Sequence, residues 1–156
     1  MLIDFENSLD YKNYLGFNFV LYNQDKINIC SSRGKEIIKE KDKIFVIGNK
    51  AFGTSSDKLD SAKKEFDQIL NTNFTNEDLL NLMQSPQESY DFDQKKLNEN
   101  HGNEFSARFI HSLIYGTRST TVMTIDRNNH IEIKEQLYDQ NGKIGQEKEF
   151  KFKVSL

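Results

Sequence analysis

Residues 111–126 read HSLIYGTRSTTVMTID, and this stretch decides the fold. The apolar run at Leu113 and Ile114 meets a Gly-Thr-Arg-Ser step, after which apolar and polar residues alternate. Such alternation is typical of a β-strand with one buried face. Across the polar segment RNNH the pattern resumes at 131–138. The sequence therefore predicts an antiparallel hairpin of strands 120–126 and 131–138.

Further strands are expected on both sides of this hairpin. Asn141-Gly142 turns the chain into 149–154, where phenylalanines alternate with charged residues. Near the N-terminus, 17–23 and 26–32 have the composition of a second hairpin. The stretch 43–49 is apolar on both faces, which indicates a central strand.

Helical periodicity occupies the middle of the chain. From Asp60, a plausible N-cap, the apolar residues fall on one stripe: Ala62, Phe66, Ile69 and Leu70. Thr75 and Asp78 have the spacing of a capping box, which predicts a second helix. Its core-facing residues would be Leu79, Leu80 and Met83. A short helix at 7–14 and a long polar loop at 84–104 complete the expectation.

These elements predict an α/β (α+β) fold, with antiparallel sheets flanked by helices, in a single domain over 1–156. A net charge of -3 with acids and bases interspersed argues against nucleic-acid binding. We expect no membrane span, because no apolar run approaches the required length. The acidic N-terminus and the single cysteine, Cys30, favour a cytoplasmic protein.

Patterns for metal binding and covalent catalysis are weak. The histidines His101, His111 and His130 are far apart, so we expect no metal site. Cys30 lies near Ile27 and Ile29 in an expected strand, where a cysteine usually packs as a small hydrophobe. A Cys30–His dyad is the alternative, and nothing local supports it. The chain contains no GxSxG motif, Walker loop or GxGxxG motif.

Arg118, at the mouth of the 120–126 strand, has two interpretations. Its guanidinium could tie loop carbonyls or a carboxylate at a sheet edge. It could instead bind a carboxylate or phosphate, helped by backbone amides and by the hydroxyls of Thr117, Ser119 and Thr120. The residues alone favour the structural interpretation.

A second candidate region for anions is the loop from Gly48-Asn49 to the first long helix. Helix N-termini attract anions, and Lys50, Lys58, Lys63 and Lys64 would add positive charge. An ordinary strand-loop-helix connection with solvated lysines explains the same pattern, and we favour it.

Six segments stand out along the chain: YLGFNFVLYN, ICSSRG, IFVIGN, KLDSAKKEF, YGTRSTTVMTID and IKEQLYD. In order and spacing they resemble the C-terminal half of the NRDE family, which includes the transport and Golgi organization proteins of eukaryotes and many bacterial relatives. The resemblance covers about 14–152, and YGTRSTTV is its most specific part. The N-terminal cysteine and the Asn-Arg-Asp-Glu segment of the family are absent.

The resemblance implies part of an αββα sandwich like that of the N-terminal nucleophile hydrolases. It implies that residues 115–119 form a fixed feature of the fold, which either anchors the sandwich or contacts a ligand. The candidate ligand-binding residues are Arg118, Tyr115, Thr117, Ser119, Asn49 and Lys63. It implies no cofactor, although haem is a candidate ligand. The missing half would leave sheet edges open, so we expect self-association or a complementary N-terminal half as partner.

Three functions follow from the resemblance. The first is a non-catalytic binding or trafficking module for a small amphipathic ligand such as haem or a lipid or acyl-CoA. The second is a portion of an N-terminal nucleophile-type amidohydrolase that lacks its nucleophile. The third is a degenerate or truncated remnant. We favour the first and expect no catalytic residues in this chain.

Overall fold

A computed structural model describes residues 16–23, 26–32, 44–48, 52–84, 108–110 and 116–154. The expected helix at 7–14 and nearly all of the expected loop at 84–104 lie outside these residues. The chain divides into two compact units, Met1–Lys63 and Lys64–Leu156. Each unit is described by itself.

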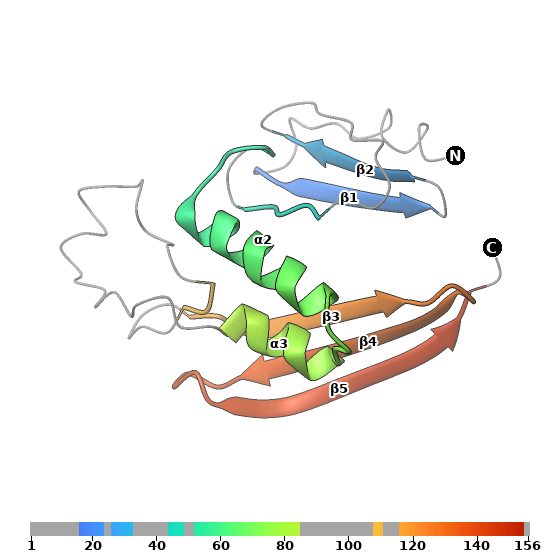
Figure 1. The fold of residues 1–156 in the computed structure, drawn as a ribbon. Coiled ribbons are helices and arrows are strands. Elements are labelled where there is room, and N and C mark those ends of the chain that lie inside the picture. The colour runs from blue at the N-terminus through green and yellow to red at the C-terminus, as the bar shows by residue number, and fades with distance from the viewer. Residues whose placement is uncertain are drawn as a thin grey trace. The chain divides into compact units, whose positions relative to one another are not determined.

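The described residues form two helices and two antiparallel sheets (Figure 1). In chain order the elements are β1 (Asn18–Asn23), β2 (Lys26–Ser31), α2 (Asp57–Leu70), α3 (Asn76–Gln84), β3 (Ser119–Ile125), β4 (His130–Tyr138) and β5 (Ile144–Lys153). This confirms the α+β class with antiparallel sheets. The αββα layering stays a prediction.

The first unit contains the hairpin of β1 and β2, which pair from Asn18–Ser31 to Asn23–Lys26. Both expected strands are therefore confirmed. The buried residues lie on β2, with Ile29 only 1% exposed and Cys30 also buried, as its apolar neighbours predicted. At the open end of the hairpin, the Phe17 amide donates to the Ser32 hydroxyl at 2.9 Å.

The expectation of a central strand at 43–49 is wrong for the described residues 44–48, which are not in a strand. The Gly48 carbonyl accepts a hydrogen bond from a side chain and not from a neighbouring strand, because Asn18 Nδ2 donates to it at 2.8 Å. A Cβ at Gly48 would lie 3.1 Å from Leu59 Cδ1. Residues 44–48 therefore have the composition of a central strand, but they are half-buried and do not pair as one.

Helix α2 begins at Asp57, three residues before the expected start at Asp60. The amides of Leu59 and Asp60 both donate to the Ser56 carbonyl at 2.9 Å, so the first turn is already closed there. Asp60 lies inside this turn, where its carboxylate accepts the Ser55 hydroxyl at 2.6 Å. A carboxylate in the first turn is favourable beside the positive end of the helix dipole.

The second unit contains the sheet β3-β4-β5, in which each strand pairs with its neighbour in sequence. Both connecting turns are stabilised in the same way, by an aspartate carboxylate that accepts two backbone amides. In the first, the Asp126 carboxylate accepts the amides of Asn128 and His130, each at 2.8 Å. The corresponding carboxylate in the second is Asp139. The third loop residue has positive φ in both turns, 62° at Asn129 and 70° at Gly142, which asparagine and glycine tolerate best.

Helix α3 packs against β3 in the second unit (Figure 1). Its capping box is confirmed, since Asp78 Oδ2 accepts the Thr75 amide at 2.7 Å and the Thr75 hydroxyl at 2.8 Å. These hydrogen bonds hold the pKa of Asp78 below its usual value. Leu80 is fully buried, but Met83 is 41% exposed, so the prediction that Met83 faces the core is wrong.

A lysine also joins α3 to the sheet. Lys134 Nζ lies 2.8 Å from Glu77 Oε2 of the helix and 3.5 Å from Glu147 Oε1 of β5. The hydrogen bond to Glu77 raises the pKa of Lys134 above its usual value. The helix-facing side of the sheet therefore has buried residues under α3, among them Val122 and Gln136, and charged residues toward β5.

Candidate functional site

The segment before β3 is held by Thr117. Its amide donates to the Ile110 carbonyl at 2.8 Å, and its hydroxyl accepts the Ile110 amide at 2.9 Å. A Cβ at Gly116 would lie 3.2 Å from the same carbonyl, so glycine suits this close approach. The hydroxyl of Thr117 thus anchors the backbone at the start of β3.

Arg118 follows this anchor, and its side chain is exposed. Its carbonyl accepts the Tyr138 amide at 2.9 Å, so its backbone continues the sheet. Its guanidinium makes no hydrogen bond or ion pair with any described residue. Neither contact of the structural interpretation, to loop carbonyls or to a neighbouring carboxylate, is therefore seen among the described residues.

The predicted site residues fall into three groups. Thr117, Arg118 and Ser119 are consecutive at the start of β3. Lys63 is exposed on α2 at the end of the first unit. Tyr115 and Asn49 lie outside the described residues.

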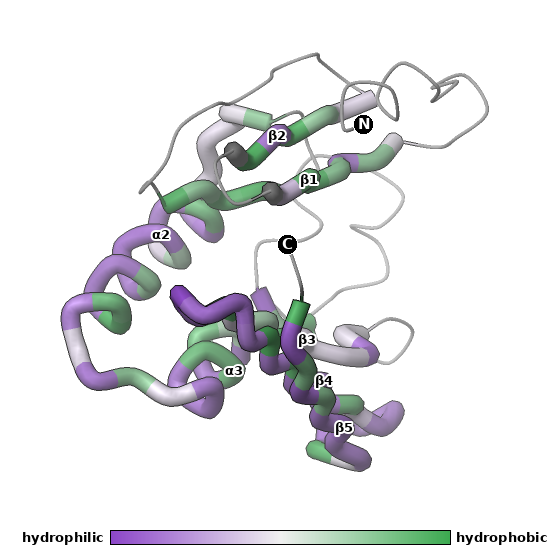
Figure 2. Tube along the Cα trace, turned by 90° about the vertical axis from the view of Figure 1, so that its right-hand side faces the viewer, coloured by the Kyte–Doolittle hydropathy of each residue, from purple (hydrophilic) through white to green (hydrophobic). Residues whose placement is uncertain are grey.

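The sheet face opposite α3 is open and apolar. The strand register places six apolar side chains on this side of the sheet. We call these six residues the apolar face: Met123, Ile125, Ile131, Ile133, Phe150 and Phe152. Their exposure reaches 58% at Met123 and 54% at Phe150. Figure 2 shows apolar and polar residues intermixed in β3, β4 and β5. Since isolated exposed apolar residues are ordinary but contiguous ones are not, this face is a candidate binding surface.

The same face becomes polar toward the start of β3. Two residues before Met123, the three strands place polar side chains side by side: Thr121, Glu135 and Lys148. Ser119 lies further along the same face, next to Arg118. Ile125 lies four positions along the strand from Thr121, so the apolar part extends about 13 Å from the polar part. The face is therefore amphipathic along the strands.

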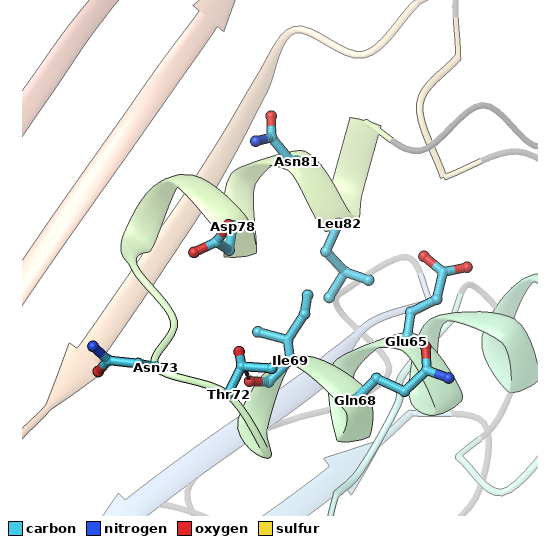
Figure 3. A pocket seen from close by; sticks show the side chains of 8 residues that line it. All are labelled: Glu65, Gln68, Ile69, Thr72, Asn73, Asp78, Asn81 and Leu82. Carbon is cyan, nitrogen blue, oxygen red and sulfur yellow. Dashed lines mark hydrogen bonds between the residues drawn. The ribbon is translucent and has the colours of Figure 1, made fainter.

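A second concavity lies between α2 and α3, with a volume of about 490 Å³ (Figure 3). Ile69 and Leu82 point toward each other at its centre. The other lining side chains are polar: Glu65, Gln68, Thr72, Asn73, Asp78 and Asn81. The lining has two carboxylates and no cation, so this groove suits neither an anion nor a large apolar ligand.

Glu65, one of the groove residues, pairs with Arg108, whose side chain is 3% exposed. Its Nη2 lies 2.8 Å from Glu65 Oε2 and 2.9 Å from Glu65 Oε1. Its Nε and Nη1 are buried and have no hydrogen-bond partner among the described residues. The pair is a charged contact between α2 and the segment 108–110.

A buried polar network lies under α3. Gln84 Nε2 donates to the Tyr138 hydroxyl at 3.0 Å and to Gln136 Oε1 at 3.3 Å. The Tyr138 hydroxyl donates to Thr120 Oγ1 at 3.1 Å. Gln136 is fully buried, and its Nε2 has no partner among the described residues.

Sequence reasoning missed both the Arg108 pair and this network. Gln136 and Tyr138 have the spacing of side chains that share one strand face, which was a usable signal. Arg108 carried no signal, because its environment comes from a residue 43 positions away. The adjacent Phe109 packs edge-on against Tyr138, with ring centroids 4.7 Å apart.

Within the described residues, no group of three or more His, Cys, Asp or Glu side chains is arranged to hold a metal ion. No helix in the described part of the chain has the length and apolarity to cross a membrane.

The described residues thus have a mixed α+β structure with antiparallel sheets and an open amphipathic sheet face. The family model for Transport and Golgi organisation 2 matches residues 3–140, and the chain belongs to that family. The resemblance that the YGTRSTTV segment indicated is thereby confirmed at the level of the family. No curated protein matches the chain.

Proposed function

We propose that this chain is a non-catalytic binding module that carries a small amphipathic ligand with an anionic end, such as haem or a lipid or acyl-CoA thioester. The observation that supports this most is the apolar face, which lies in the same sheet as the exposed Arg118. Such a ligand requires an apolar surface and a cation in the same site. Arg118 immediately precedes β3 and alternates to the other side from Ser119, so the proposal requires its long side chain to reach the apolar face around the end of the strand.

In this proposal the apolar body of the ligand covers Met123, Ile133 and Phe150, which are neighbours across the three strands. Each square ångström of apolar surface removed from water contributes about 25 cal/mol. The anionic end binds Arg118, with the Ser119 hydroxyl as a second donor. A hydrogen bond to a charged group contributes about 1.5–3 kcal/mol. Burial of more than about 120 Å² of apolar surface would therefore contribute more than the Arg118 hydrogen bond. Arg118 fixes the orientation of the ligand.

Titration with haem, followed by its Soret band, tests the proposal. The parent protein is expected to shift the band, and Arg118→Ala to weaken binding by roughly tenfold or more while the circular dichroism spectrum stays unchanged. The matched control is Arg127→Ala, since Arg127 is also exposed but lies at the opposite end of β3. Met123→Glu tests the apolar half.

Three outcomes would contradict the proposal. They are no binding of haem or acyl-CoA at micromolar concentration, equal loss in the Arg118 and Arg127 variants, or full binding by Met123→Glu. An acyl-CoA titration by calorimetry separates the two ligand classes, because only haem would give the optical signal.

Four further expectations stay predictions. They are that this chain corresponds to the C-terminal part of the family domain, that it has no catalytic residues of its own, that it is cytoplasmic, and that it does not bind nucleic acid.

A further inference from the structure

Strand β5 has an open outer edge. All ten of its residues are exposed, although β4 pairs with it along its inner edge. No described residue pairs with the outer edge. A long open edge exposes a row of unpaired amides and carbonyls, and proteins normally cover or blunt it.

The register identifies which backbone groups face outward. The Val154 amide donates to the Asn129 carbonyl at 3.1 Å, so at this position the groups of β5 point toward the β4 side. Antiparallel pairing alternates this direction from one residue to the next. The outward amides and carbonyls therefore belong to residues at odd positions: Glu147, Glu149, Lys151 and Lys153.

These four residues have an ordered charge pattern, with two acids followed by two bases. An antiparallel copy of the strand reverses the order, so acids meet bases. We propose that β5 pairs antiparallel with β5 of a second copy, about a twofold axis at Phe150. The pairing places Glu149 opposite Lys151 of the other copy and Glu147 opposite Lys153. It forms about eight backbone hydrogen bonds, because each of four facing pairs exchanges two.

Neighbouring registers are disfavoured by charge. An axis at Glu149 or at Lys151 places that residue opposite its own copy, and parallel in-register pairing does the same for every residue. Lysines on an edge strand ordinarily discourage pairing. Here the charge of the outward residues changes from negative to positive halfway along the strand. The lysines therefore favour an antiparallel copy of the same strand in one register.

The side chains on the two faces fit the same axis. On the helix-facing side, Lys151 Nζ already lies 3.0 Å from Glu149 Oε1 and 3.4 Å from Glu132 Oε1, and a second copy extends this network. On the other side, Phe150 meets its own copy, and the two apolar faces join across six strands. The proposed ligand is not required for this pairing, because the pairing uses the edge and the ligand uses the face.

Complementary charge variants test the pairing in the full chain. Analytical ultracentrifugation is expected to find a dimer for the parent protein. Lys151→Glu and Glu149→Lys, each alone, place like charges opposite each other and should weaken dimerisation by roughly tenfold or more. An equimolar mixture of the two variants restores both opposite-charge pairs, so it should form a heterodimer.

The mixture separates pairing from folding, because a misfolded variant would not be rescued by its counterpart. Lys143→Glu is the matched control, since it makes the same charge change in the turn before the paired segment. The proposal is overturned if the parent protein stays monomeric at hundreds of micromolar. It is overturned equally if the single variants dimerise like the parent, or if their mixture does not associate.

Discussion

Replacing Gln136 with methionine should stabilise the protein. The side chain is fully buried, its Nε2 lacks a partner among the described residues, and its Oε1 accepts only the 3.3 Å bond from Gln84. An unpartnered buried donor costs about 1–3 kcal/mol, whereas a hydrogen bond contributes about 0.5–1.5 kcal/mol. The length of the Gln84 bond places its contribution near the lower limit. Gln136→Met should therefore raise the free energy of unfolding by about 1 kcal/mol.

The substitution leaves no new unpartnered group. Gln84 Nε2 keeps its 3.0 Å bond to the Tyr138 hydroxyl, and methionine has a similar shape and size to glutamine. Gln84→Met is the matched control, and its effect on the free energy of unfolding should be opposite, because it leaves both polar atoms of Gln136 unpartnered. It should lower the free energy of unfolding by about 1–2 kcal/mol.

Urea unfolding followed by circular dichroism measures both variants. A Gln136→Met protein that is less stable than the parent would refute the reasoning, since it would mean that Nε2 contributes a favourable interaction. Equal destabilisation in both variants would show that the pair acts only through packing.

Two other predictions concern charged groups. Glu65→Gln leaves the buried Arg108 guanidinium without its carboxylate, so it should lower the free energy of unfolding by about 2 kcal/mol, below the ~3–5 of a fully buried pair. Unchanged stability in urea would contradict this. The pKa of Asp78 is lowered by its hydrogen bonds from Thr75, so its contribution to stability is complete above the unfolded value of about 3.9 and is lost as pH falls through the lower folded value. Asp78→Asn should show a smaller loss of stability between about pH 4 and pH 2 than the parent, and an unchanged pH profile would contradict the assignment.

The parts of the fold that the sequence predicted are those specified locally. Alternation and turn residues located both hairpins, and the spacing of Thr75 and Asp78 located the start of α3. The start of α2 was misplaced, because Ser56 and Asp60 are both residues that favour a helix N-terminus, and only the backbone geometry separates them.

The features that the sequence did not predict depend on residues distant in sequence. Residues 44–48 have the composition of a strand, but a strand also needs a neighbour, and composition does not specify one. Ser119 and Arg118 were selected for their residue types. The apolar face beside them needed the register of three strands before Met123, Ile133 and Phe150 became neighbours.

The two similar turns of the second unit also bear on how the chain folds. Every pairing in β3-β4-β5 joins neighbours in sequence, whereas the contacts of Gln84 with the sheet span 52 and 54 residues. Hairpins with short connections close within about 1–10 μs, and long-range contacts follow later because loop closure opposes them. Helix α3 precedes the strands in the chain, so during synthesis it emerges before the surface on which it packs. The meander of three strands is then the template on which this helix finally docks.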